Sequence, residues 1–196
     1  MVETIHTKST LAERVNALAP FVGNTPLFDI SHLQDNPEVK IFAKLEWNQL
    51  SNSVKARAAY RIIKEAIDKG LVNENKGIID ASSGNTAVAY ATIGANIGLP
   101  ITLCVPENAS PQKRAALKAL GANMIYTSKF GTTDVAQEKA KELSIAHPDQ
   151  YYYADQYANE NNWKAHYYST ALEIWEQTEG QITHYVAGLG TTATFI

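Results

Sequence analysis

Lys55 stands where a helix should bury its side chain. Between residues 54 and 69 the apolar residues recur at the spacing of an amphipathic helix. At about 100° per residue, Lys55 falls on the apolar side, between Ile62 and Ala66. The other charged side chains of this stretch gather on the opposite side: Arg57, Arg61, Lys64 and Asp68.

A lysine in this position could act as a nucleophile. Ser53 or Asn52 is the expected N-cap, which places Lys55 in the first helical turn. Burial and the positive end of the helix dipole both disfavour a cation there, and a neutral lysine amine forms Schiff bases. In the alternative interpretation the lysine stem lies along the edge of the core and its ammonium reaches water. This stretch alone leaves both interpretations open.

A second segment that could bind a ligand is the loop Ser-Ser-Gly-Asn-Thr at 82–86, which follows a strand-like run and precedes a helix. A loop at a helix N-terminus presents backbone N–H groups and hydroxyls that suit a carboxylate or a phosphate. Asn85 adds both a donor and an acceptor. The alternative is simple helix capping by serine or asparagine. The loop is not a P-loop, because no Gly-Lys-Ser/Thr follows.

Two further segments are less specific. Residues 188–194, GLGTTAT, fit either a dinucleotide fingerprint or a turn that cradles a single phosphate. Gln156, Asn159 and Asn162 are amides near an expected helix start, where ordinary turn chemistry is the alternative.

Strand and helix patterns alternate along the chain, and the elements that they predict must position these segments. This alternation predicts an α/β fold with largely parallel sheets and right-handed crossovers. The expected strands are 40–46, 77–81, 101–106, 123–128, 151–157 (a short strand with its loop) and 183–188. The expected helices are 11–19, 54–69, 86–98, 111–120, 132–146 and 163–177.

Composition narrows the function classes. A 45% hydrophobic and 19% charged chain of 196 residues is typical of a globular protein. The net charge of −3 and the absence of a long apolar run speak against nucleic-acid and membrane partners. The five histidines lack metal-ligand spacing, and the single Cys104 cannot form an internal disulfide, so we expect no metal and a cytoplasmic location.

Taken in order, the motifs resemble the cysteine synthase branch of the fold-type-II pyridoxal-phosphate enzymes, which includes O-acetylserine sulfhydrylases and cystathionine β-synthases. The GTT start of the last loop is more similar to the cysteine synthase B subgroup. The resemblance covers nearly the whole chain. It rests on GNTPL (23–27), KLEWNQLSNSVKAR (44–57), SSGNT (82–86), VPENAS (105–110), LKALGA (117–122), DQYANENN (155–162), EIWEQTEG (173–180) and VAGLGTTAT (186–194).

The resemblance implies a role for each motif. Lys55 would hold pyridoxal phosphate as a Schiff base and serve as the catalytic base, and Asn85 would contact the 3′-oxygen of the cofactor. The cofactor phosphate would lie against Gly190, Thr191, Thr192, Ala193 and Thr194. The carboxylate of the amino-acid substrate would lie against Ser82, Ser83, Gly84, Asn85, Thr86 and Gln156. The implied reaction replaces the acetate or phosphate of O-acetylserine or O-phosphoserine with a sulfur nucleophile, giving cysteine.

The resemblance also implies a two-lobed architecture similar to tryptophan synthase β. Residues 1–46 would begin the large lobe, 47–157 would form the small lobe, and 158–196 would start the remainder of the large lobe, whose rest is absent. Relatives are usually homodimers, so a homodimer is expected at full length. A non-catalytic, truncated relative that acts as a binding partner is the main alternative, and a nicotinamide-dependent enzyme is the third.

This sequence departs from the family pattern at several positions. Ala56 stands where the family usually has aspartate, and Ala193 replaces a glycine in the phosphate loop. A Cβ at 193 would be strained if the backbone there needs a positive φ. Leu50-Ser51-Asn52 replaces the usual proline-threonine-glycine, and Ala171 replaces a common glycine. None of these changes removes a catalytic group.

Overall fold

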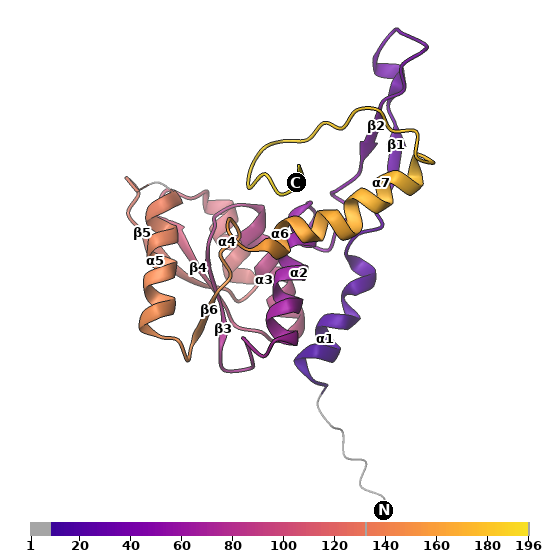
Figure 1. Ribbon diagram of the computed structural model, residues 1–196. Helices are drawn as coiled ribbons and strands as arrows, with labels where there is room; N and C mark the ends of the chain where they lie inside the picture. The colour runs from indigo at the N-terminus through magenta and orange to yellow at the C-terminus, as the bar shows by residue number, and fades with distance from the viewer. Residues whose placement is uncertain (1–8, 132, 196) are drawn as a thin grey trace, which may run out of the picture.

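A four-stranded parallel sheet lies towards one end of the molecule, at the left of Figure 1. The computed structural model describes residues 9–131 and 133–195. The strand order is β5-β4-β3-β6, and the α/β prediction is confirmed. The strands are β3 (Gly77–Ala81), β4 (Ile101–Pro106), β5 (Asn123–Thr127) and β6 (Tyr151–Tyr153), connected by α3 (Asn85–Ile97), α4 (Pro111–Ala119) and α5 (Thr133–Ala146).

Helices cover both faces of this sheet. Alternate residues of β3 and β4 point to opposite faces, so Ile78 and Leu103 join one core while Ile79 and Cys104 join the other. The larger core also contains α1 (Leu11–Ala17), α2 (Lys55–Asp68), α3 and α4, whereas α5 packs alone on the opposite face. Both faces of β3 are buried, which explains why Asp80 is its only charged residue.

The strand order creates a switch point between β3 and β6. The chain moves outward from β3 through β4 to β5, and α5 then returns it across the other face to β6, on the far side of β3. In open α/β sheets, ligands bind at such points, beyond the carboxyl ends of the strands. The carboxyl ends of β3 and β6 lead directly into residues 82–86 and Gln156.

A separate antiparallel pair, β1 (Leu27–Asp29) and β2 (Phe42–Lys44), lies at the other end of the molecule beside α7 (Ala171–Gln177) (Figure 1). The sequence patterns predicted the second strand of this pair but not the first. Short helical turns occupy Ala19–Phe21 and Ser31–Leu33. No helix within residues 9–131 and 133–195 is long and apolar enough to cross a bilayer.

Two predicted elements differ from the structure. The expected helix 163–177 is three segments: α6 (Glu160–Ala165), a π-helical stretch His166–Thr170, and α7. The expected strand 183–188 has no regular structure, although its residues favour strands. A strand requires a partner for its backbone groups, and none of the described strands pairs with this segment. Val186 within it is 91% exposed.

Candidate active site

A cavity of about 310 Å³ opens at the switch point of the parallel sheet. Its size lies at the lower end of the range for small-molecule sites. Three segments that are distant in the sequence meet there, namely the start of α2, the loop after β3 and the C-terminal loop. Its walls are formed by Lys55, Ala81, Ser82, Ser83, Gly84, Asn85, Thr86, Cys104, Pro106, Thr133, Ala136, Gln156, Tyr157, Gly190 and Thr191.

Lys55 is the first residue of α2 and lines this cavity. Burial lowers the pKa of its ammonium, and no hydrogen bond or ion pair holds it within the described part of the chain. The expected N-cap was wrong, because Val54 occupies that position without a side-chain bond. The turn forms earlier: Asn52 adopts φ 55°, and the Ser53 carbonyl accepts from the Ala56 N–H.

The loop at 82–86 leaves the N-terminus of α3 without a side-chain cap. Gly84 is the N-cap and makes no side-chain bond, so the capping interpretation of this loop was wrong. The Ser82 hydroxyl accepts from the Gly84 N–H at 3.3 Å. The side chains of Ser83, Asn85 and Thr86 have no hydrogen-bond partner among the described residues. The first turn of α3 therefore offers unpaired N–H groups and polar side chains to the cavity.

Gln156 is buried against the carboxyl end of β3. Its side-chain amide donates to the Ala81 carbonyl at 3.0 Å, and its backbone N–H donates to Asp80 Oδ2 at 3.3 Å. Asp80 Oδ1 accepts from the Ala81 N–H at 2.8 Å. Burial raises the pKa of the Asp80 carboxyl to about 7. The amide of Gln156 uses only one of its two hydrogens here, which leaves the second available to a ligand.

The C-terminal loop brings part of the predicted phosphate cradle to the cavity. Gly190 and Thr191 line it, whereas the walls do not include Thr192, Ala193 and Thr194. The positive φ of this loop lies at Thr192, with φ 65°, and not at Ala193, which is buried. The alanine that replaces the family glycine therefore causes no left-handed strain.

The donor set of the cavity fits an anionic ligand. The donors that line it favour a negatively charged ligand: Lys55, the serine and threonine hydroxyls, and the N-terminus of α3. No carboxylate belongs to the described residues that line it. Cys104 also lines the wall, but burial raises the pKa of its thiol to about 11, so it stays protonated.

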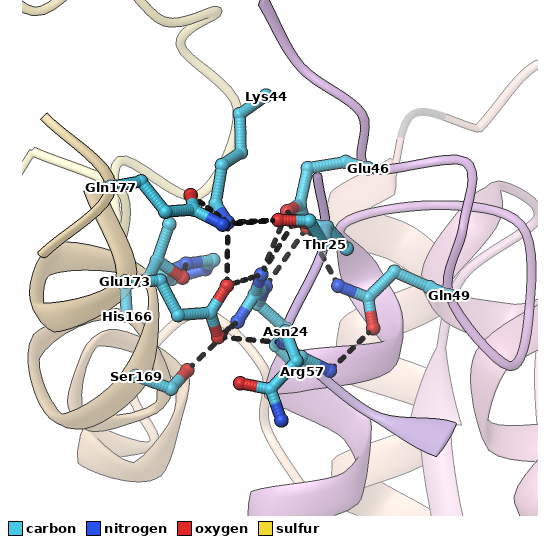
Figure 2. Close-up of polar contacts among 12 residues, drawn as sticks. Asn24, Thr25, Lys44, Glu46, Gln49, Arg57, His166, Ser169, Glu173 and Gln177 are labelled. Carbon is cyan, nitrogen blue, oxygen red and sulfur yellow. Dashed lines mark hydrogen bonds and ion pairs between the residues drawn. The ribbon is translucent and has the colours of Figure 1, made fainter. Parts of the chain in front are cut away.

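Arg57, two residues after Lys55, anchors α2 in a buried ionic cluster that the sequence analysis missed (Figure 2). Its side chain is 1% exposed. It donates to both oxygens of Glu46, at 2.9 and 2.8 Å, and to both oxygens of Glu173, at 2.6 and 2.7 Å. Lys44 Nζ donates to Glu173 at 2.7 Å and Thr25 adds a hydroxyl, so α2, β2, α7 and the 23–25 turn meet at one point.

The cluster explains why glycine stands at position 23. Gly23 has φ 86°, and a Cβ there would lie 2.9 Å from Glu173 Oε1 and 3.2 Å from Arg57 Nη1. Although burial alone would raise the pKa of Glu173, the bonds from Arg57 and Lys44 lower it to about 2. Arg57 therefore ties the first turn of α2 to segments from both ends of the chain.

Nearby, His166 was also missed, since an isolated histidine carries no distinctive spacing. Its Nδ1 lies 3.0 Å from the Thr170 hydroxyl. Burial, followed by the positive charges of Lys55 and Arg57, lowers its pKa to about 4, which keeps the imidazole neutral near pH 7.

Comparison with known proteins agrees with this chemistry. Residues 18–196 match the family model described as pyridoxal-phosphate dependent enzyme. A cysteine synthase from Aquifex aeolicus is 46% identical over 178 residues, which are 89% of this chain and 54% of that protein. Cysteine synthase B from Salmonella typhimurium is 40% identical over 182 residues, which are 92% of this chain and 59% of that protein.

A solved structure gives the same result. The crystal structure of O-acetyl serine sulfhydrylase isoform 3 from Entamoeba histolytica superposes with a TM-score of 0.80 at 33% identity, covering 99% of this chain and 57% of that one. This chain thus spans little more than half the length of these relatives. The matches leave the nicotinamide interpretation of GLGTTAT without support.

Proposed function

This chain belongs to the family of pyridoxal-phosphate dependent enzymes, and we propose that it makes cysteine by replacing the leaving group of an activated serine with a sulfur nucleophile. The observation that carries the proposal is that one cavity brings together Lys55, the loop at 82–86, Gln156, Gly190 and Thr191. The similarity to cysteine synthases and to an O-acetyl serine sulfhydrylase supports the reaction class.

The cofactor side of the site consists of Lys55, Asn85 and the loop at 190–194. When bound, pyridoxal phosphate supplies an electron sink for the α-carbon of an amino acid. Lys55 Nζ would hold it covalently, the Asn85 side chain would contact its 3′-oxygen, and Gly190, Thr191, Thr192, Ala193 and Thr194 would surround its phosphate. Hydroxyls and backbone N–H groups of a tight turn are suited to a phosphate dianion.

The substrate side consists of the loop at 82–86 and Gln156. The N–H groups at the start of α3, together with Ser82, Ser83, Gly84, Asn85 and Thr86, bind the substrate carboxylate. The second amide hydrogen of Gln156 completes this anion site. Closure of the loop over the substrate excludes water and orders the site.

Lys55 also moves the proton. Burial lowers the pKa of its ammonium, so a neutral amine forms at a lower pH than in water. Once the amino group of the serine derivative has displaced Lys55, the freed Nζ would remove the α-proton as a general base. Acetate or phosphate would leave as the anion, and Nζ would return the proton after the sulfur nucleophile has added. A position in the first turn of α2 favours the neutral form further, because the helix dipole repels a cation there.

The proposal extends to partners and organisation. The partners are an O-acetylated or O-phosphorylated serine and a sulfur donor such as sulfide or thiosulfate. We propose a homodimer at full length and a cytoplasmic location. The net charge of −3 supports the absence of nucleic-acid and anionic-membrane partners. We assign 47–157 to a small lobe, and 1–46 and 158–196 to a large lobe; the separate pairing of β1 with β2 supports this division.

Visible absorption spectroscopy tests the assignment. The chain is mixed with pyridoxal phosphate, and then O-acetylserine or O-phosphoserine is added, followed by sulfide or thiosulfate with detection of cysteine. We expect a visible band in the wild type and in Lys64→Ala, which removes an exposed lysine of the same helix, and no band in Lys55→Ala. A band that persists in Lys55→Ala would contradict the role of Lys55.

A shift of the band with either serine derivative, followed by cysteine formation, is the expected outcome. The derivative that gives the larger kcat/KM identifies the leaving group. A band without any spectral response to either derivative would contradict the proposed reaction.

A further inference from the structure

Asn162 bridges two residues of the cavity wall, Gln156 on the proposed substrate side and Thr191 on the proposed phosphate side. It is the third residue of α6 and is buried. Its Nδ2 donates to the Gln156 carbonyl at 2.6 Å and to the Thr191 hydroxyl oxygen at 3.0 Å. Gln156 and Thr191 both line the cavity, whereas Asn162 does not.

These two contacts make the Thr191 hydroxyl the acceptor in its hydrogen bond with Asn162. The Gln156 oxygen belongs to the backbone carbonyl and can only accept a hydrogen bond. The nitrogen of the Asn162 side-chain amide must therefore face it. The same nitrogen then donates its other hydrogen to Thr191 Oγ1. A hydroxyl that accepts from Asn162 keeps its own hydrogen for another acceptor, and Thr191 stands at the cavity wall.

We propose that Asn162 is a positioning residue that turns the Thr191 hydroxyl into a donor for the cofactor phosphate and couples it to Gln156. This inference rests on the proposed function. Its distinguishing consequence is selectivity for the phosphate group. A residue that only supports the fold would weaken binding of pyridoxal phosphate and of pyridoxal, which lacks the phosphate, to the same degree.

The test measures the dissociation constants of pyridoxal phosphate and pyridoxal by absorption titration, with folding checked by circular dichroism. For Asn162→Ala we expect the ratio of the pyridoxal dissociation constant to the pyridoxal phosphate dissociation constant to fall about tenfold, the effect of losing one hydrogen bond to a charged group. Asn161→Ala is the matched control. Asn161 is the neighbouring amide of the same helix. Among the residues that the structure describes, its side chain bonds to Asn159 alone, so the ratio of Asn161→Ala should equal that of the wild type.

A double-mutant cycle with Thr191→Val isolates the bond. Because valine has no hydroxyl to orient, Asn162→Ala should change the ratio by less than about threefold in that background. Asn162→Asp has nearly the same volume and serves if the alanine variant does not fold. Its carboxylate would accept the Thr191 hydrogen and turn it away from the cavity, so the ratio should fall at least as far as in Asn162→Ala.

The outcomes separate this inference from the function on which it rests. If the wild type forms no Lys55-dependent band, the proposed function fails and the role of Asn162 fails with it. If the wild type binds the cofactor but Asn162→Ala leaves the ratio unchanged, only the role of Asn162 is refuted. An undiminished effect of Asn162→Ala in the Thr191→Val background would refute it as well.

Discussion

Replacing Arg57 with methionine should destabilise the fold more than any other single charge removal on α2. Methionine keeps much of the apolar stem of the side chain but removes the guanidinium and its hydrogen bonds to Glu46, Glu173, Ser169 and Thr25 (Figure 2). Two carboxylates would then remain close together in a largely buried site. The loss therefore combines broken bonds with uncompensated negative charge.

The structure sets the size of this effect. Breaking a fully buried pair costs about 3–5 kcal/mol. Glu46 and Glu173 keep 19% and 12% side-chain exposure, and Lys44 still pairs with Glu173. These features place the expected loss near the lower limit, at about 3 kcal/mol. With a urea m-value of about 2 kcal/mol per M, the unfolding midpoint should fall by about 1.5 M.

Urea unfolding followed by circular dichroism measures this loss. Lys64→Met, on the same helix, is the matched control. Lys64 pairs with Asp68 at the surface, and such i,i+4 pairs contribute only about 0.3–0.5 kcal/mol. Adding Glu46→Gln to Arg57→Met removes the carboxylate that loses its only ion-pair partner among the described residues, whereas Glu173 keeps Lys44, so the double variant should recover part of the lost stability.

The pH dependence provides a second readout. The pKa of Glu173 is lowered from 4.5 to about 2 in the folded chain. Its contribution is present above about 4.5 and disappears as the pH falls toward 2. Without Arg57 the pKa rises, so this acid-dependent loss should shrink. If Arg57→Met unfolded at the same urea concentration as Lys64→Met, the structural role assigned to the cluster would be wrong.

Two further predictions concern the parallel sheet. Gly77→Ala should cost about 2 kcal/mol or more, because its Cβ would clash with the Pro100 carbonyl oxygen. Gly188→Ala should be nearly neutral, because apart from its chain neighbours its Cβ would meet no described atom within 4 Å; urea midpoints compare the two. The folded pKa of Asp80 is raised from 3.8 to about 7, so its contribution is most favourable at low pH and is lost as the pH rises through 7. Asp80→Asn should therefore flatten the decline in stability between about pH 4 and 7, and an unchanged profile would contradict the raised pKa.

Local patterns predicted the elements of the parallel sheet well. The bounds of β3 and β4 are those expected from their apolar runs, and α2 begins and ends within one residue of its prediction. These elements are buried on most sides, so the hydrophobic pattern records their environment directly. The placement of Lys55 among apolar neighbours predicted a side chain in a protected site, and it lines the cavity.

The features that were missed depend on contacts between distant segments. Arg57 shares a helix face with charged surface residues, and only the arrival of Glu46 and Glu173 from opposite ends of the chain buries it. The π-helical stretch at 166–170 interrupts a continuous helical pattern, and nothing in the local sequence signals it. For residues 183–188, strand propensity was overestimated, because propensity cannot supply the partner strand that a ladder needs.

The first turn of α2 links the ionic cluster to the chemistry of the cavity. Lys55 and Arg57 are two residues apart, so at about 100° per residue their side chains leave the helix on nearly opposite sides. One faces the cavity and the other is clamped by two carboxylates. Between them Ala56 is fully buried, and an aspartate, usual in the family, would need a partner there. Fixing the helix at Arg57 therefore fixes the backbone from which the Lys55 side chain reaches the cavity, while its amine has no hydrogen-bond partner among the described residues.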